Sequence, residues 1–323
     1  MTHWKHRPEG GGYFAVWLIR TIASRGGRAV ARALLWPITV YFVLVRGPER
    51  RASRQYLSRV LPHPPGLRHV ARHIHTFAST ILDRVFLLSG QLERFDIQVT
   101  GVEDLHERLD RGQGVLVFGS HLGSFDALRV LATRRPDIKV RVLLDKAHNA
   151  AVQQLLDALN PEMARNIIDA GQDGPSIVLA IKEALDEGAL VALLVDRAAA
   201  GEPSLPAPLL GDEAQFPTAP WLIAATLRVP VTLAFGLYRG GNRYELAFES
   251  FSPGLSIPRH NRAQALAELV QAYARRLQDH ALRAPYNWFN FYDFWQTDDA
   301  TDRDPHVPGD PAAGRRLPAG RTA

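Results

Sequence analysis

Short apolar runs alternate with helix-like segments over residues 95–248, and this alternation restricts the fold more than any other feature of the chain. The expected strands are residues 96–99, 114–119, 140–144, 166–168, 189–195, 231–235 and 244–248. The expected helices are residues 102–110, 124–134, 149–159, 176–187, 218–227 and 262–282. Alternation of this kind builds a sheet that is covered by helices on both faces. The sequence therefore predicts an α/β fold with a mixed, mostly parallel sheet.

The segment GVLVFGSHLGSFD, residues 114–126, contains a possible catalytic pair. A buried strand ends at the turn Gly119-Ser120, which is followed by His121, and Asp126 lies five positions further on. Ligands of such sheets bind at the carboxyl ends of the strands. We expect Asp126, in the first turn of the next helix, to contact His121 and fix its tautomer. His121 would then act as a general base.

Three other interpretations of this segment stay open. The His-x4-Asp spacing also occurs by chance, Asp126 could simply complement a helix N-terminus, and His121 could be an ordinary loop histidine. A metal site is disfavoured here, because no further cluster of ligands lies nearby in the sequence. His69 and His73 lie at helical spacing but likewise lack a third ligand. We therefore predict no metal and no bound cofactor.

Basic charge is concentrated in the first 94 residues. They contain 15 Lys or Arg and 4 Asp or Glu, whereas the remaining residues contain 23 and 29. This asymmetry indicates an anionic partner at one end of the protein. Apolar segments separate the arginines and no nucleic-acid-binding motif is present, so a lipid surface fits better than nucleic acid. The chain has no cysteine, which excludes disulfides, thiolate zinc sites and a cysteine nucleophile.

Residues 13–46 contain two apolar stretches that are split by the sequence RGGR at 25–28. The longer uncharged run, residues 33–45, has 13 residues, whereas a helix that crosses a bilayer needs about 20. Its length, Pro37 and the flanking arginines favour an interfacial or re-entrant membrane segment that Pro37 breaks. A buried core helix and a cleaved signal peptide are the alternatives. Internal arginines and the absence of a convincing cleavage site argue against the signal peptide.

We predict four regions along the chain: a membrane anchor at residues 1–46, a helical cap at 47–94, the α/β domain at 95–296 and a disordered tail at 297–323. The tail has almost no large apolar residue. Within the α/β domain, seven aromatic residues occupy the ten positions 286–295. Core packing is the favoured interpretation of this aromatic segment, and a lipid-facing platform is the alternative.

Two further groups of residues are candidates for a binding site. Asp196 and Arg197 follow a predicted strand, where they could bind a phosphate, fix a loop or form a structural salt bridge. Phe216, Pro217 and Thr218 indicate a turn into a helix, with Thr218 near its start. The amides of that helix could bind an anion, or Thr218 could simply cap it.

Several stretches, in this order, resemble the bacterial lipid A biosynthesis acyltransferase family of the lysophospholipid acyltransferase superfamily. They are the basic N-terminal anchor, LDRVFLL at 82–88, GSHLGSFDALR at 119–129, VDR at 195–197, LLGDEAQFPTAP at 209–220 and PYNWFNFYDFW at 285–295. The resemblance implies an enzyme on the cytoplasmic face of the bacterial inner membrane. It would move a fatty acyl group from acyl carrier protein, or from coenzyme A, to a lipid hydroxyl.

By this resemblance His121 is the general base and Asp126 its partner. The other expected site residues, assigned to substrate binding, are Ser120, Gly123, Asp196, Arg197, Phe216, Pro217 and Thr218. We expect no covalent intermediate and assign Ser120 no nucleophilic role. A noncatalytic lipid-binding or assembly protein with this fold, and a thioesterase or lipid hydrolase, are the rival functions.

The sequence also departs from that family. Members often carry Glu in place of Asp126, Gln in place of Arg197, and an arginine after the third strand, where residues 147–160 contain none. These departures resemble the glycolipid acyltransferase-like branch found beside polyketide or aryl polyene pigment genes. The expected acceptors are therefore a glycolipid, a lipid A-type molecule or a lysophospholipid.

Overall fold

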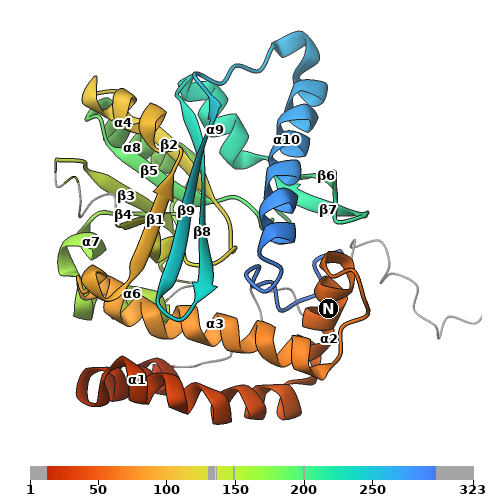
Figure 1. Cartoon of the computed structure of the whole chain (residues 1–323). Coiled ribbons are helices and arrows are strands. Elements are labelled where there is room, and N and C mark those ends of the chain that lie inside the picture. The colour runs from red at the N-terminus through yellow and green to blue at the C-terminus, as the bar shows by residue number, and fades with distance from the viewer. Residues whose placement is uncertain (1–12, 130–134, 136, 148–149, 199–200, 296–323) are drawn as a thin grey trace, which may run out of the picture.

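A computed structural model describes residues 13–129, 135, 137–147, 150–198 and 201–295. Its centre is a seven-stranded sheet with the order β1-β9-β8-β2-β5-β3-β4 (Figure 1). All neighbouring strands are parallel except the antiparallel pair β8 and β9. The strands are β1 (Asp96–Thr100), β2 (Val115–Gly119), β3 (Val140–Leu144), β4 (Ile167–Asp169), β5 (Leu190–Leu194), β8 (Val231–Gly240) and β9 (Arg243–Ser252). The predicted fold class is confirmed.

Helices cover both faces of this sheet, and β2 shows why. Leu116 and Phe118 belong to an apolar cluster that includes residues of α9 and α10, whereas Val115 and Val117 belong to a cluster that includes residues of α3 and α6. A strand buried on both faces needs an uninterrupted apolar run, as β2 has. The helices are α1 (Tyr13–Val45), α2 (Gly47–Val60), α3 (Leu67–Leu88), α4 (Glu103–Asp110), α6 (Ala150–Leu159), α7 (Pro161–Arg165), α8 (Gly174–Asp186), α9 (Ala219–Leu227) and α10 (Arg262–Arg283).

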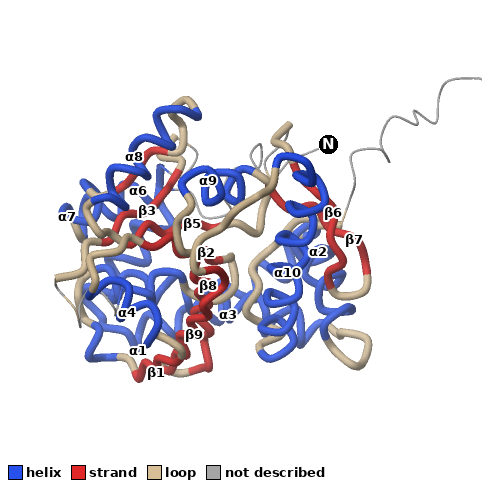
Figure 2. The backbone as a smooth tube through the Cα atoms, turned by 90° about the horizontal axis from the view of Figure 1, so that it is seen from above, coloured by secondary structure: helices blue, strands red, loops and turns tan. Residues whose placement is uncertain are grey.

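Two secondary-structure predictions within residues 95–296 were wrong. The proline-rich stretch before α9 forms an antiparallel hairpin of β6 (Ser204–Leu209) and β7 (Asp212–Pro217), which lies beside α10 (Figure 2). Both strands are edges, where prolines are tolerated, so Phe216 and Pro217 lie on a strand and not in a turn. The helix predicted at residues 124–134 is a 3-10 helix, η3 (Phe125–Arg129). Residues 130–134 lie outside the described part of the chain, as does the predicted tail.

The apolar N-terminal segment forms helix α1, which lies along α3 (Figure 1). Its irregular residue is Gly27, with φ 73° and ψ 172°, and the helix continues through Pro37. The predicted break at Pro37 is therefore wrong. A proline inside a helix costs about 3 kcal/mol, and packing against α3 offsets this cost, since Leu35 and Thr39 on either side of Pro37 are buried.

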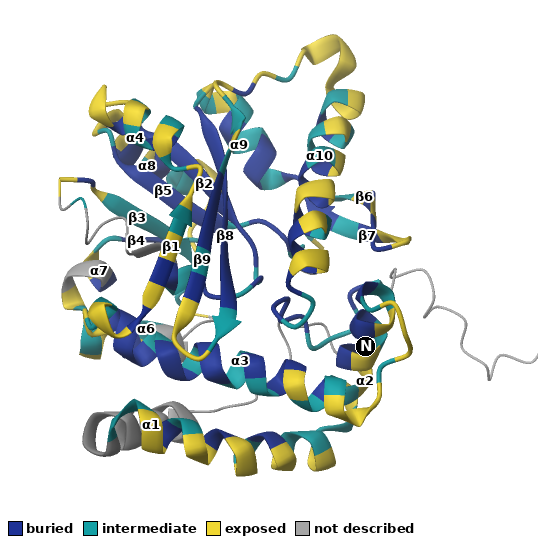
Figure 3. Cartoon of the chain, in the orientation of Figure 1, coloured by how far each residue is buried: buried dark blue, intermediate teal, exposed yellow. Residues whose placement is uncertain are grey.

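The opposite face of α1 is apolar and exposed (Figure 3). The stretch Gly27–Val45 has 19 residues and a mean hydropathy of 1.5, and 17% of it is buried. It is long and apolar enough to cross a membrane. Between residues 27 and 45, the large apolar side chains that α1 exposes are Val30, Leu34, Trp36, Val40, Tyr41, Leu44 and Val45.

A buried ion pair attaches α1 to the rest of the protein. Arg28 Nε and Nη2 donate to the two carboxylate oxygens of Asp83 on α3, at 2.8 and 2.9 Å. Tyr244 of β9 donates its hydroxyl to the same carboxylate at 2.9 Å, and Asp83 is fully buried. Arg32 Nη1 contacts Tyr238 of β8 at 3.0 Å. Helix α1 is thus held against α3 and the β8–β9 hairpin by charges as well as by apolar contacts.

Candidate active site

The turn after β2 carries His121 and is held from two sides. Gly123 has φ 76°, and its amide donates to the carbonyl of Asn287 at 2.7 Å. A Cβ atom on Gly123 would lie 1.9 Å from the carbonyl oxygen of Gly236 on β8, so only glycine fits. On the other side, the amide of Phe289 donates to the carbonyl of His121 at 2.9 Å. The histidine is therefore fixed between β8 and the aromatic segment.

Asp196 reaches His121 because β2 and β5 are parallel neighbours. The register pairs Gly119 with Leu194, so His121 and Asp196 each lie two residues beyond the same pair. Asp196 Oδ1 lies 2.7 Å from Nδ1 of His121, and Oδ2 accepts the His121 amide at 3.0 Å. The indole Nε1 of Trp288 donates to Oδ2 at 3.0 Å. The carboxylate is 0% exposed and has three donors.

These contacts keep Asp196 ionised. Burial opposes its ionisation, but the hydrogen bond of His121, the charge of the His121 ring whenever it is protonated, the charge of Arg197 and the Trp288 hydrogen bond outweigh burial, so the pKa of Asp196 lies well below its ordinary value. An ionised carboxylate can only accept, so Nδ1 of His121 carries the proton. Nε2 of the neutral ring is then unprotonated, as a general base requires.

His121 itself is suited to the neutral state. Burial and the nearby charge of Arg197 lower the pKa of its imidazole, and attraction to Asp196 only partly offsets them. Its side chain is 30% exposed, so the ring is not sealed from solvent. The pair therefore presents an unprotonated nitrogen at neutral pH, backed by a carboxylate that would stabilise the imidazolium formed by proton transfer.

The predicted contact between Asp126 and His121 is wrong. Asp126 Oδ2 accepts from Nε of Arg84 on α3 at 2.6 Å, and no hydrogen bond joins Asp126 to His121 within the described residues. The 3-10 turn carries Asp126 toward α3, where a guanidinium neutralises it, and Asp196 occupies the position on Nδ1. A catalytic role for Asp126 stays a prediction.

Arg197 holds the aromatic segment in place. Its Nε donates to Oδ1 of Asn290 at 2.6 Å, and its Nη2 donates to the carbonyl of Phe289 at 2.9 Å. These contacts favour the loop-fixing interpretation of Arg197 over the phosphate interpretation. Ser120 is buried beside the histidine, and no hydrogen bond joins the two side chains among the residues described.

The other three predicted residues lie in the core or at its edge. The ring of Phe216 is fully buried against those of Tyr273 and Phe294. Thr218 precedes α9, but its hydroxyl donates to the carbonyl of Pro203 at 3.1 Å instead of capping the helix. No hydrogen bond in the described chain joins this group to His121. A substrate-binding role for Phe216, Pro217 and Thr218 stays a prediction.

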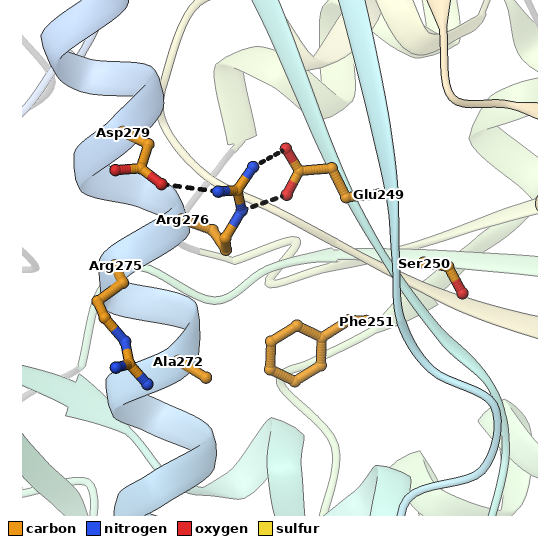
Figure 4. A pocket seen from close by; sticks show the side chains of 7 residues that line it. All are labelled: Glu249, Ser250, Phe251, Ala272, Arg275, Arg276 and Asp279. Atoms are coloured by element: carbon orange, nitrogen blue, oxygen red, sulfur yellow. Dashed lines mark hydrogen bonds and ion pairs between the residues drawn. The ribbon is translucent and has the colours of Figure 1, made fainter.

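A cavity of about 360 Å³ lies elsewhere, between β9 and α10 (Figure 4). Arg276 of α10 donates to Glu249 of β9 and to Asp279, three residues further along α10. None of the predicted site residues lines this cavity; its lining residues are Glu249, Ser250, Phe251, Ala272, Arg275, Arg276 and Asp279. In the part of the chain that the structure covers, no group of three His, Cys, Asp or Glu residues could hold a metal ion.

Sequence reasoning missed two residues of this site. The sequence predicts only packing for Trp288, and it gives Arg84 no role beyond its place in the stretch LDRVFLL. The packing prediction is confirmed for Trp288, Phe289 and Phe294, which are buried. A usable signal was present, because the N–H of a buried tryptophan usually finds a hydrogen-bond partner. The identity of that partner was not readable from the sequence.

One comparison with known proteins found a matching family. The family described as bacterial lipid A biosynthesis acyltransferase has a sequence model that matches residues 11–297. The match includes α1, the whole sheet, His121, Asp196 and the aromatic segment. A search among curated proteins found no match.

Proposed function

The chain belongs to the bacterial lipid A biosynthesis acyltransferase family, and from this premise we propose that it transfers a fatty acyl group from a thioester to a hydroxyl of a membrane lipid. One observation carries the mechanism. The buried, ionised Asp196 binds Nδ1 of His121 at 2.7 Å, which leaves Nε2 as an unprotonated base.

The reaction follows from this arrangement. Nε2 of His121 takes the proton of the acceptor hydroxyl while the hydroxyl oxygen attacks the thioester carbonyl. A C–O bond forms, and the carbonyl electron pair moves onto oxygen. When the tetrahedral intermediate collapses, the C–S bond breaks, and the imidazolium returns the proton to the leaving thiolate. Asp196 stabilises the imidazolium throughout. The products are an ester and a free thiol, and no covalent enzyme intermediate is needed.

Acyl carrier protein is the proposed donor, with acyl coenzyme A as the alternative. Carrier proteins are acidic, and α2 and α3 expose the arginines Arg51, Arg54, Arg68 and Arg72. Opposite charge speeds the encounter of two proteins and favours one orientation. The proposed acceptor is a glycolipid, a lipid A-type molecule or a lysophospholipid, because the family acts in lipid A biosynthesis while residues 147–160 lack the arginine expected there.

We place the protein on the cytoplasmic face of the bacterial inner membrane, with α1 lying in the membrane surface. The exposed face of α1 is apolar, whereas its other face is clamped by the Arg28–Asp83 pair. A crossing orientation would carry this ion pair and the adjoining α3 into hydrocarbon at high cost. In liposome flotation, Val40→Asp together with Leu44→Asp should abolish co-flotation. Ser58→Asp, on the exposed side of α2, is the control, and equal flotation of both variants would contradict the placement.

The function is tested with purified protein, acyl carrier protein loaded with a radiolabelled fatty acyl chain, and a bacterial inner-membrane lipid extract. Wild type should produce one new acylated lipid, which mass spectrometry identifies, and His121→Ala should not. His260→Ala, on an exposed turn, is the matched control and should keep full activity. Full transfer by His121→Ala would remove the mechanism.

The same assay separates the rival functions. Release of free fatty acid without an acylated lipid would indicate a hydrolase. Lipid retention by His121→Ala, together with full rescue of cells that lack the protein, would indicate a noncatalytic lipid-binding protein.

A further inference from the structure

A chain of hydrogen bonds continues from Asp196 into the helical cap. Trp288 donates its indole N–H to Asp196, and its backbone carbonyl lies 2.9 Å from Nε2 of His73 on α3. Nδ1 of His73 lies 2.9 Å from the hydroxyl of Ser53 on α2. Trp288, His73 and Ser53 are all fully buried. The chain thus runs from α2 through α3 and the aromatic segment to His121.

The direction of each bond in this chain is determined. A backbone carbonyl only accepts, so Nε2 of His73 carries a proton. Burial lowers the pKa of His73 to about 4, so the ring is neutral at physiological pH and its Nδ1 accepts from Ser53. Asp196 is ionised and only accepts. Every donor therefore has one partner, which is the condition under which a buried polar network specifies one geometry.

Aromatic packing also holds Trp288 in place. The ring of Tyr56 on α2 lies 5.3 Å from that of Trp288 and 5.4 Å from that of His73. Trp288 also pairs with Leu122, the residue after the histidine, in an isolated β-bridge. The tryptophan therefore contacts the helical cap on one side and the catalytic turn on the other.

We propose that Trp288 and His73 are positioning residues, through which the helical cap sets the orientation of the Asp196 carboxylate and hence the tautomer and basicity of His121. The expected change in kcat rests on the proposed acyl transfer. The expected change in the pKa of His121 does not.

Loss of the indole donor has two consequences. Without it, Oδ2 of Asp196 keeps only the backbone amide of His121, so the carboxylate is oriented less firmly, while Oδ1 stays on Nδ1 of His121. The carboxylate also becomes a stronger attractor for the imidazolium, which raises the pKa of His121. Arg84 and Arg197, the other charged groups that act on this imidazole, and Asp126 beside Arg84 stay in place.

Trp221 offers a matched control. It is also fully buried, but its Nε1 has no hydrogen-bond partner within the described residues. Its ring lies 5.0 Å from that of Phe118 on β2. Trp288→Phe and Trp221→Phe therefore delete the same atoms from two fully buried sites, and only the first deletes a hydrogen bond to the site.

Kinetics give the first measurement. Trp288→Phe should lower kcat about 10- to 100-fold, as expected for one hydrogen bond to a charged group, with KM for both substrates unchanged. The acid limb of its kcat/KM profile should move to higher pH. Trp221→Phe should keep kcat within about twofold. Equal kcat values and equal pH profiles for the two variants would overturn the proposal.

A second pair of variants covers the case in which Trp288→Phe does not fold. His73→Gln keeps an N–H that can donate to the carbonyl of Trp288, whereas His73→Leu removes it. His73→Gln should have a kcat and a pH profile close to those of wild type. His73→Leu should not. Equal behaviour of the two variants would contradict the role of His73.

NMR titration of the His121 ring separates this inference from the proposed function, because it needs no turnover. The pKa of His121 should be higher in Trp288→Phe than in wild type and unchanged in Trp221→Phe. An inactive wild type with this shift would refute acyl transfer and keep the positioning chain. An active wild type without this shift in Trp288→Phe would support acyl transfer and refute the positioning chain.

Discussion

Two carboxylates lie near the end of β2, and their surroundings differ. Asp196 is fully buried and receives three hydrogen bonds, two from His121 and one from Trp288. The side chain of Asp126 is 15% exposed and is paired with one guanidinium, that of Arg84. Asp126 is five residues from the histidine in the sequence and Asp196 is 75. Sheet register, and not sequence distance, therefore decides which acid meets the histidine.

The difference has a local cause. Asp196 continues a strand that is paired in register with β2, so its position relative to His121 is set by backbone hydrogen bonds. Asp126 lies in a short 3-10 helix that follows Gly123 and faces α3. Replacing each acid by its isosteric amide compares the two sites directly.

The largest effect should come from Asp196→Asn. The amide can present N–H to Nδ1 and so favour the wrong tautomer, and kcat should fall about 10³- to 10⁴-fold. Asp126→Asn should lower kcat by about tenfold or less, because its carboxylate bonds Arg84 and not the imidazole. Steady-state kinetics measures kcat for both variants and for wild type. The comparison breaks if Asp126→Asn proves the more damaging change.

The next effect is on stability and concerns the support behind Asp196. His73 is buried and neutral with a pKa of about 4, below the value of about 6.5 in an unfolded chain. Its contribution to stability is complete above pH 6.5 and is lost as the pH falls toward 4, because the unfolded chain binds the proton first. The loss should be about 3 kcal/mol.

Urea unfolding of wild type and His73→Gln between pH 7 and 4 measures this loss. Wild type should lose stability more steeply than the variant. Parallel curves would show that His73 is not buried as the structure has it, and would weaken the contrast between the two acids.

A smaller effect is expected from the ion pair of the second acid. Arg84→Met and Asp126→Asn should each lower the free energy of unfolding by about 1 kcal/mol, and the double variant should lose less than the sum. A double-mutant cycle in urea gives the coupling energy. Strict additivity would mean that Arg84 and Asp126 do not interact, and Asp126 would then be free to contact His121.

The smallest effect is a shift in the pH dependence of wild type. Burial and Arg197 lower the pKa of His121, so the acid limb of kcat/KM should lie below pH 6.5. Activity should fall only as the pH drops through that lowered value, since protonated His121 cannot act as a base. In any Asp196→Asn protein with measurable activity the limb should lie lower still. A limb above pH 6.5 would argue that Asp196 dominates the electrostatics of the ring more than the structure indicates.

Much of the fold was predictable because its signals are local. All seven strands of the main sheet overlap predicted strands, whose signals are a continuous apolar run, as in β2, or alternation of apolar and polar residues, as in β1. The turn after β2 was readable from Gly119 and Ser120. The β6–β7 hairpin was not, because its prolines are typical of loops. Helix α1 continued through Pro37 because its contacts with α3 outweigh a local preference to break.

The sequence alone determined where the strands of the main sheet lie in the chain, the place of His121 after β2 and the apolar, basic character of the N-terminal region, since each depends on residues that are neighbours in the chain. Only the tertiary structure decided that Asp196 orients the histidine, that Trp288 holds Asp196, and that Arg28 clamps α1. Those contacts join residues 75, 92 and 55 positions apart. They form because strand register and helix packing bring specific atoms within hydrogen-bond distance, and no local pattern encodes that geometry.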